Sequence, residues 1–318
     1  MYEDINGMKK LIRTAKKAGA DAVKIQTYRA ETIALPGAEF EFEDSSRMSQ
    51  MEFFKRYEIS RETHKILFDY AREIGITIFS TPSYYDDVDF LNELGVPAFK
   101  IGSDDLTNYP FLEYAAVKGK PMIVSTGMAT LKEVKKAVDA ISKTGNGQFI
   151  LLQCTTSYPA EPQYANLNII RTFQSAFGMP IGYSDHVPGI LSSVLAAGMG
   201  ASLIEKHLTL NRVLKRPDYQ VSIEPSEFEE MVKEIRLVPV LQGESIKKVY
   251  PPEEKWRKSA RKSIVAVRDI KKGARLRIDD VKIIRPGLGV DPGRLDAFVN
   301  KILKRDLFKN EAIPEDAV

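Results

Sequence analysis

Seven short apolar runs, separated by helical stretches, constrain the fold of this chain more than any other feature of its sequence. Each run is five to eight residues long, is rich in β-branched residues, and follows an amphipathic segment. The runs are Asp21–Thr27, Ile76–Thr81, Ala98–Ser103, Met122–Thr126, Phe149–Thr156, Ile181–His186 and Ser202–Thr209. Strands that alternate with helices in this way pair in parallel, and repeated units of this size build a (β/α)8 TIM barrel.

The expected fold class is therefore α/β, a TIM barrel whose first strand is missing at the N-terminus. No Gly-x-Gly-x-x-Gly follows any run, which argues against a dinucleotide-binding doubly wound sheet. The chain begins almost directly in the helical segment Met8–Lys17, so the eighth strand is expected to precede Met1. Without it, two strands would be exposed edges, and we expect poor activity until roughly 15 to 25 upstream residues are restored.

A smaller β-rich domain is expected after the barrel. The barrel is predicted over residues 1–240, a linker over 241–257 and the small domain over 258–318. Prolines and a glycine with little periodicity indicate the linker. Two β-runs, Ser263–Val267 and Val281–Ile284, and a short helix near Arg294–Phe298 predict the second domain.

Composition excludes several classes of function. The 318 residues include 46 basic and 43 acidic side chains, a balance too even for a nucleic-acid-binding surface. No apolar run could span a bilayer, and the N-terminus lacks the apolar region of a secretory signal. The single cysteine, Cys154, excludes an intramolecular disulfide. We expect a cytoplasmic protein with no nucleic acid or membrane partner.

Polar side chains collect where the apolar runs end, which in a barrel is where active sites lie. They are Lys24, Gln26, Thr81, Lys100, Ser103, Asp105, Ser125, Thr156, Ser184, His186, Glu205 and His207. A buried charge without a partner is costly, so charges inside apolar runs predict a shared ligand or ion. Lysines beside hydroxyls suit a phosphate and a carboxylate together better than they suit Schiff-base chemistry, since nothing in the sequence depresses a lysine pKa.

Two histidines, His186 and His207, end consecutive runs and should be neighbours in the barrel. They could hold one divalent cation with substrate and water in the open positions, or each could be hydrogen-bonded in the core. The third histidine, His64, falls on a predicted surface helix, Glu62–Ile74, and is expected to have no role. Cys154 is expected to be a packed, inert thiol.

The combination of motifs resembles the sialic acid synthases, which make N-acetylneuraminate, legionaminate or pseudaminate. The C-terminal segment is similar to the antifreeze-like (SAF) domain of that family, a small β-clip fold, through Asp269–Gly273. The motifs run in order over nearly the whole chain, and together they are specific. They are Ala18–Thr27, Phe79–Pro82, Lys100–Pro110, Ser125–Met128, Gln153–Pro159, Gly182–His186, Glu205–Thr209 and Arg285–Gly287.

The resemblance implies condensation of phosphoenolpyruvate with an N-acetylmannosamine-type aldehyde, giving a nine-carbon α-keto acid and phosphate. It implies Mn²⁺ or Mg²⁺ on His186 and His207, with Lys24 and Glu205 also catalytic. A homodimer is implied, in which Arg285 of one SAF domain reaches the partner's barrel. The family's phosphoenolpyruvate contacts correspond to Lys24, Thr81, Lys100, Ser103, Ser125 and Ser184, with Glu205 nearby. Its sugar contacts correspond to Gln26, Asp105, Tyr158 and Asp218.

Three departures from the family pattern stand out. The first strand, with its Glu-x-Gly-x-Asn-His motif, is absent, Thr156 replaces an asparagine of some members, and Lys215–Asp218 replaces a Gly-Gly-Pro-Asp-like turn. The alternatives that stay open are a legionaminate or pseudaminate synthase, a metal-dependent aldolase or epimerase on the same barrel, and an inactive truncated or carbohydrate-binding form. Lys100, Ser103 and Arg285 argue against the aldolase.

Overall fold

Seven parallel strands form the central sheet of the first of two units. The computed structural model describes residues 4–41 and 47–318, and the chain divides into Met1–Gly243 and Glu244–Val318. The sheet order is β1-β4-β5-β6-β7-β8-β9, with every neighbouring pair parallel. The strands are β1 (Ala22–Thr27), β4 (Thr77–Pro82), β5 (Phe99–Ile101), β6 (Met122–Ser125), β7 (Phe149–Cys154), β8 (Ile181–Asp185) and β9 (Ile204–Lys206).

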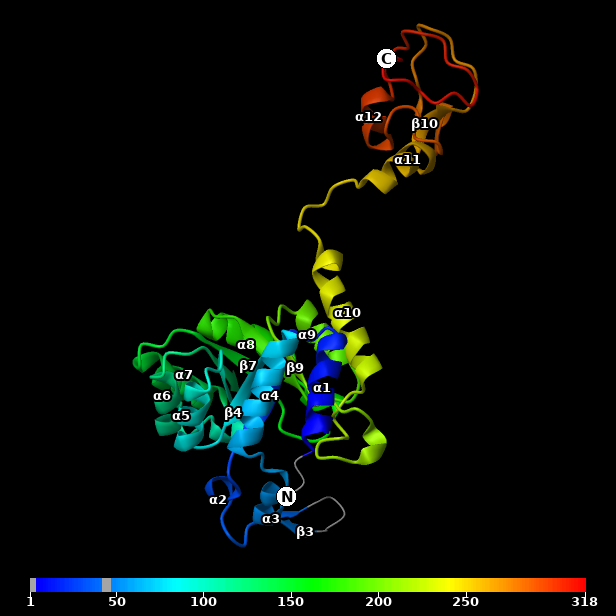
Figure 1. Cartoon of the computed structure of the whole chain (residues 1–318). Helices are drawn as coiled ribbons and strands as arrows, with labels where there is room; N and C mark the ends of the chain where they lie inside the picture. Colours follow the sequence, from blue (N-terminus) through cyan, green and yellow to red (C-terminus); the bar gives the residue numbers. More distant parts are fainter. Residues whose placement is uncertain (1–3, 42–46) are drawn as a thin grey trace. The chain divides into compact units, whose positions relative to one another are not determined.

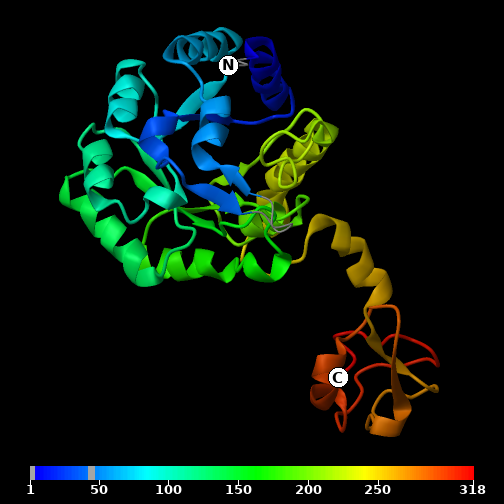
Figure 2. The ribbon, with the colours of Figure 1, turned by 90° about the horizontal axis from the view of Figure 1, so that it is seen from below.

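Helices cover the outside of this curled sheet, as the cyan-to-green arc in Figure 2 shows. The predicted alternation of strands and helices is confirmed, and the architecture is that of a barrel of βα units. The helices of this layer are α1 (Ile5–Lys17), α4 (Arg61–Ile74), α5 (Tyr85–Glu93), α6 (Tyr109–Ala116), α7 (Leu131–Lys143), α8 (Asn168–Phe177), α9 (Leu191–Gly198) and α10 (Pro225–Gln242), with the short 3-10 turns η1 (Ser103–Asp105), η2 (Pro162–Tyr164) and η3 (Arg212–Leu214) between them.

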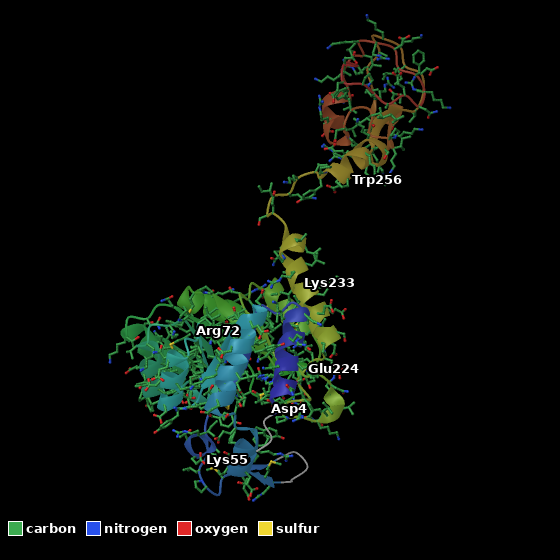
Figure 3. The ribbon with its side chains drawn as sticks, in the orientation of Figure 1. Asp4, Lys55, Arg72, Glu224, Lys233 and Trp256 are labelled. Atoms are coloured by element: carbon green, nitrogen blue, oxygen red, sulfur yellow. The ribbon has the colours of Figure 1, made fainter. Side chains whose placement is uncertain are left out.

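Local chemistry sets where these helices begin. The Asp4 carboxylate accepts a hydrogen bond from the Gly7 amide at 2.8 Å, which starts α1. At the start of α10, Glu227 accepts from the backbone amide of Glu224 at 2.8 Å. Figure 3 shows Asp4 and Glu224 at these two helix starts. The expected start of the barrel domain at residue 1 lies outside the described residues.

The two ends of the sheet face each other. Within residues 4–41 and 47–318, β1 and β9 each have a strand neighbour on one side only. A cavity of about 610 Å³ lies against both strands and is also lined by α1 and α10, which lie side by side (Figure 1). The first four residues of β1 and all three of β9 are half-buried, whereas the residues of β5 and β8 are buried.

An insertion after β1 departs from the βα rhythm. It contains α2 (Ala30–Ile33), α3 (Gln50–Tyr57) and an antiparallel pair, β2 (Glu39–Glu41) with β3 (Arg47–Ser49). Aromatic side chains hold it together, since the rings of Phe40 and Phe54 lie 5.8 Å apart and those of Tyr28 and Phe54 lie 5.4 Å apart.

The second unit is a small β-rich domain with its own core. Strands β10 (Ser263–Ala266) and β11 (Val281–Ile284) fall on the two predicted β-runs, and they pair antiparallel. The turns η4 (Ile278–Asp280) and η5 (Pro292–Arg294) precede β11 and the short helix α12 (Leu295–Phe298). Ile264, Leu276, Val290 and Phe298 are among its buried core residues.

Two expectations about helices need correction. The segment predicted as a linker, 241–257, holds the last residues of α10 and much of α11 (Pro251–Ala260). Prolines suit the first turn of a helix, and the Glu253 carboxylate accepts from the Tyr250 amide at 2.9 Å, so α11 forms. His64 does lie on a helix, but it is completely buried rather than on the surface.

The finding on membrane spans agrees with the sequence. Among the residues that the structure describes, no helix is both long enough and apolar enough to cross a bilayer.

Gly182 of β8 packs closely against β7 and the residue before β9, so adding a methyl group there should lower the stability of the barrel. A Cβ added at Gly182 would lie 2.5 Å from Leu152 Cδ2 and 2.7 Å from the Leu203 carbonyl oxygen. Because a backbone oxygen cannot move aside, Gly182→Ala should destabilise the barrel by about 1–3 kcal/mol. Gly147→Ala, where nothing lies within 4 Å, is the matched control. Thermal unfolding that is the same for both variants would contradict this packing.

Candidate active site

A buried acid stands between two lysines at one end of the sheet. Glu205 of β9 lies 3.3 Å from Lys24 Nζ of β1 and 3.9 Å from Lys100 Nζ of β5. The ion pair of Lys24 with Glu205 joins the two edge strands, which share no backbone pairing. Lys24 and Glu205 are far apart in the sequence, and they come into contact because the sheet curls and brings its two edge strands together.

These charges change one another's acidity. Burial alone would raise the pKa of Glu205, but Lys100 and Lys24 outweigh it and hold that pKa well below its ordinary value. Burial lowers the pKa of Lys100 to about 8, although Glu205 acts in the opposite direction. The expectation that nothing depresses a lysine pKa was therefore wrong, because the sequence does not show that Lys100 is only 2% exposed.

Hydroxyl groups surround the two lysines. Lys100 Nζ donates to Ser125 Oγ at 2.6 Å, and Ser184 Oγ donates to Glu205 at 2.8 Å. Ser103 Oγ accepts from the Gly127 amide at 3.0 Å. A Cβ at Gly127 would lie 2.1 Å from the hydroxyl oxygen of Thr156, so only glycine lets the chain approach this closely.

Two of the buried hydroxyls have no partner. They are the Oγ1 atoms of Thr81 and Thr156, both inaccessible to solvent. Buried polar atoms are nearly always hydrogen-bonded, so these two hydroxyls are exceptions in the described structure.

The histidine pair lies next to this cluster. The rings of His186 and His207 are 5.3 Å apart, and the ring of Tyr158 lies 4.2 Å from that of His186. His186 Nδ1 is 2.8 Å from the carbonyl oxygen of Thr155. A carbonyl can only accept, so Nδ1 carries the proton and Nε2 keeps its lone pair.

Both imidazoles are neutral at physiological pH. Burial lowers the pKa of His186, and burial together with Lys24 lowers the pKa of His207 to about 3. The 3.7 Å approach of His207 Nδ1 to the Asp218 carboxylate is therefore not an ion pair. Burial raises the pKa of Asp218, with Lys24 acting against it.

This donor set fits a divalent cation with open coordination positions. Neutral imidazole is the form that binds metal, and the carbonyl that orients His186 is a typical outer partner of a metal ligand. Within the described chain, no group of three or more His, Cys, Asp or Glu side chains is arranged to enclose a metal. The two histidines would leave the remaining positions to water and substrate.

The structure brings most of the predicted site residues together. Ion pairs and hydrogen bonds join Lys24, Lys100, Ser125, Ser184 and Glu205. Side-chain contacts join His186, His207, Tyr158 and Asp218, while Ser103 and Thr156 meet at Gly127. Gln26 lies near the end of β1, Thr81 near the end of β4 and Asp105 in the turn η1 after β5, and the described residues show no side-chain contact between these three and that cluster. Arg285 lies in the second unit, just after β11.

Sequence reasoning missed two residues that bear on the site. Gly127 shapes the pocket, and Asp104 adds negative potential at Lys100 and Tyr158. Asp185, the residue before His186, does not join the site and pairs with Lys206 at 3.0 Å. The orientation of Asp185 could have been predicted from the sequence, because successive residues of a strand point to opposite faces and Asp185 directly follows Ser184.

Comparison with known proteins shows which family the chain belongs to. Residues 11–247 match the NeuB family and residues 261–318 match the SAF domain. The chain belongs to the NeuB family. It is 43% identical to an uncharacterised protein of Methanocaldococcus jannaschii over 98% of this chain and 89% of that protein. It is 39% identical to the N,N'-diacetyllegionaminic acid synthase of Legionella pneumophila, over 96% of this chain and 88% of that enzyme.

A solved structure agrees with this assignment. The N-acetylneuraminic acid synthetase of Leptospira borgpetersenii serovar Hardjo-bovis, determined in complex with citrate, superposes with a TM-score of 0.72 at 33% identity. The match covers 80% of this chain and 85% of that one. The resemblance to sialic acid synthases and to the SAF domain is thereby confirmed, and members of this NeuB family include synthases of more than one nonulosonic acid.

The environment of the one cysteine predicts its reactivity. Burial raises the pKa of Cys154, and the residue is only 7% exposed, so the thiol is protonated and shielded. The folded chain should react with a disulfide reagent at pH 8 far more slowly than the same chain in denaturant. Because the sequence has a single cysteine, absorbance of the released thiolate reports this site alone. Equal rates in both states would overturn the assignment.

Proposed function

We propose that this NeuB-family chain condenses phosphoenolpyruvate with an N-acetylmannosamine-type aldose, yielding a nine-carbon α-keto acid and phosphate. The observation that carries the proposal is the pair of lysines around Glu205, lined by hydroxyls and flanked by two neutral histidines. Phosphoenolpyruvate combines a phosphate with a carboxylate, and this site offers cations and hydroxyl donors for both.

The lysines and hydroxyls act on phosphoenolpyruvate. Lys24, Lys100 and Ser125 grip its anionic groups, and the unpaired hydroxyls of Thr81 and Thr156 supply further donors. Lys100 and Lys24 hold the pKa of Glu205 low, so Glu205 is ionised and its negative charge favours the protonated form of Lys100. Once the enol carbon bonds to the aldehyde carbon, water adds at C2, and one of its protons ends on the former aldehyde oxygen. The C2 hydroxyl then becomes the keto group as phosphate leaves with the C–O electron pair and the second proton, so that atoms and charges balance.

The histidines act on the aldehyde. A divalent cation, Mn²⁺ or Mg²⁺, bound at His186 and His207 would supply Lewis-acid polarisation of the aldehyde oxygen. His186 is oriented by the Thr155 carbonyl, and the Tyr158 ring packs on it and excludes water from one side. In this proposal His186, His207 and Tyr158 surround the aldehyde end of the sugar.

The remaining polar residues are proposed sugar contacts. Gln26, Asp105, Tyr158 and Asp218 carry amide, carboxyl and phenol groups that suit hydroxyls and an acetamido group. Burial raises the pKa of Asp105 to about 6, so this carboxylate accepts hydrogen bonds at neutral pH and gains a donor proton as the pH falls below about 6. Neuraminate-type and legionaminate-type acceptors differ at positions that these groups would contact. Comparing the rates with each acceptor decides between them.

We also propose that the active form is a cytoplasmic homodimer in which Arg285 of one SAF domain completes the partner's site. An arginine binds a planar carboxylate with two parallel hydrogen bonds, which a lysine cannot do. Mixing two inactive variants, Arg285→Ala and Lys100→Ala, should restore up to about a quarter of the sites if donation is reciprocal.

Phosphate release tests the reaction directly. Incubation with phosphoenolpyruvate and N-acetylmannosamine should release phosphate only when both substrates and Mn²⁺ are present. His186→Ala and His207→Ala should each lower the rate by more than about a hundredfold, because each removes a nitrogen ligand, while unfolding stays nearly unchanged. Phosphate formation without the sugar would contradict condensation, and sugar turnover without phosphoenolpyruvate would favour the aldolase.

His64→Ala is the contrasting variant. His64 is buried and its ring contacts Thr27 Oγ1 and the Ser60 carbonyl oxygen, both at 2.8 Å. Its removal should lower the unfolding temperature and leave kcat near that of the parent. A large loss of kcat with unchanged stability would place His64 in the chemistry instead.

The pH dependence follows from the charges. Lys100 binds anions only when protonated, and its pKa is about 8, so kcat/KM should fall as the pH rises through that value. Glu205→Gln removes the carboxylate that raises the Lys100 pKa, and the alkaline limb should move down by about one unit or more. The exposed Glu93→Gln is the control. A limb unmoved by Glu205→Gln would show that Lys100 is not the titrating group.

A further inference from the structure

A buried ion pair joins β8 and β9 directly behind the two histidines. Asp185 Oδ2 lies 3.0 Å from Lys206 Nζ, and both side chains have no exposed surface. The two residues are also direct partners in the backbone register of these strands. The pair therefore fixes how far one strand can slide along the other.

The carboxylate of Asp185 is saturated with hydrogen bonds. Oδ1 accepts from the Tyr183 hydroxyl at 3.1 Å and from the Val187 amide at 2.9 Å. Oδ2 accepts from Ser192 Oγ at 2.7 Å and Ser193 Oγ at 2.6 Å, both in the first turn of α9. Lys206 Nζ also donates to the Val187 carbonyl. One network thus ties together β8, β9 and the start of α9.

This network lies on the face opposite the candidate site. Ser184 and Glu205 are register partners and hydrogen-bond on the site face, so the next residues, Asp185 and Lys206, point the other way. The residue after each of these is a histidine, His186 or His207. The ion pair therefore holds the end of each strand in place at the residue directly before its histidine.

Stability alone does not account for such a pair. Well-packed apolar residues of similar volume are often as stable as a buried ion pair, whereas a fully satisfied polar network defines one geometry. We propose that Asp185 and Lys206 are positioning residues that hold His186 and His207 at the spacing one divalent cation requires. This inference rests on the proposed function, in which those histidines are the metal ligands.

A neutral replacement of nearly equal shape tests this. D185N/K206M removes both charges and leaves no buried ion unpaired, so its unfolding temperature should stay close to the parent's. Its affinity for Mn²⁺, titrated by the electron paramagnetic resonance signal of the free ion, should fall by about tenfold or more. The KM for phosphoenolpyruvate should change little, because Lys100 and Ser125 lie on other strands.

Two further variants keep the test decisive. Ser192→Ala removes one hydrogen bond from Asp185 without stranding a charge, and should weaken Mn²⁺ binding by a smaller factor even if the double variant fails to fold. Lys118→Met removes a lysine that pairs with Asp89 at 2.6 Å between α5 and α6, and should leave Mn²⁺ binding unchanged. Mn²⁺ affinity equal to the parent's in both Ser192→Ala and the double variant would overturn the positioning role.

Measurements on the parent protein distinguish failure of the positioning role from failure of the proposed metal site. If the parent binds Mn²⁺ and releases phosphate but the variants bind Mn²⁺ equally well, only the positioning role is wrong. If the parent itself neither binds Mn²⁺ nor needs it, the proposed metal site at His186 and His207 fails first.

Discussion

Burying charge inside a parallel sheet is the constraint on which the site depends. Lys100 is almost fully buried, and a lone ammonium there would be strongly disfavoured. Glu205, within 4 Å of both Lys100 and Lys24, makes that burial tolerable, and Ser125 and Ser184 complete the hydrogen bonds. The three ionised groups carry one net positive charge, so their electrostatic potential favours an anion over a cation.

Successive side chains of β8 and β9 point to opposite faces of the sheet, so each strand contributes both to the site and to the packing behind it. One face carries Ser184 and Glu205 toward the site, and the other carries the Asp185–Lys206 pair toward α9. Both faces end at a histidine. Because removing one partner of a buried ion pair costs about 3–5 kcal/mol, substitutions at this second face also affect stability unless both charges are removed together.

The sequence predicted the fold well where the signal is local. All seven runs are strands, because β-branched apolar residues between helical segments leave few alternatives. The insertion over α2, β2, β3 and α3 was not predicted, since aromatic contacts between residues far apart stabilise it rather than local periodicity. Helix α11 was also missed, because its prolines look like loop residues until their first-turn position is known.

For the site, the sequence indicated which residues gather but not how they act on one another. The residue types at strand ends were sufficient to group Lys24, Lys100 and Glu205. Burial decided the rest: it lowers the Lys100 pKa, keeps His207 neutral and makes His64 structural. Burial depends on the packing of many distant residues, so no local pattern could have shown it.

The central claim is that the buried lysines form a site for a phosphate and a carboxylate held together. Calorimetric titration of phosphoenolpyruvate and of pyruvate, against the parent and Lys100→Met, tests it most directly. The account predicts that the parent binds phosphoenolpyruvate at least about tenfold more tightly than pyruvate, and that Lys100→Met removes this preference, since a charged hydrogen bond is worth roughly 1.5–3 kcal/mol. Equal affinity of the parent for both ligands, or a preference that survives in Lys100→Met, would contradict it.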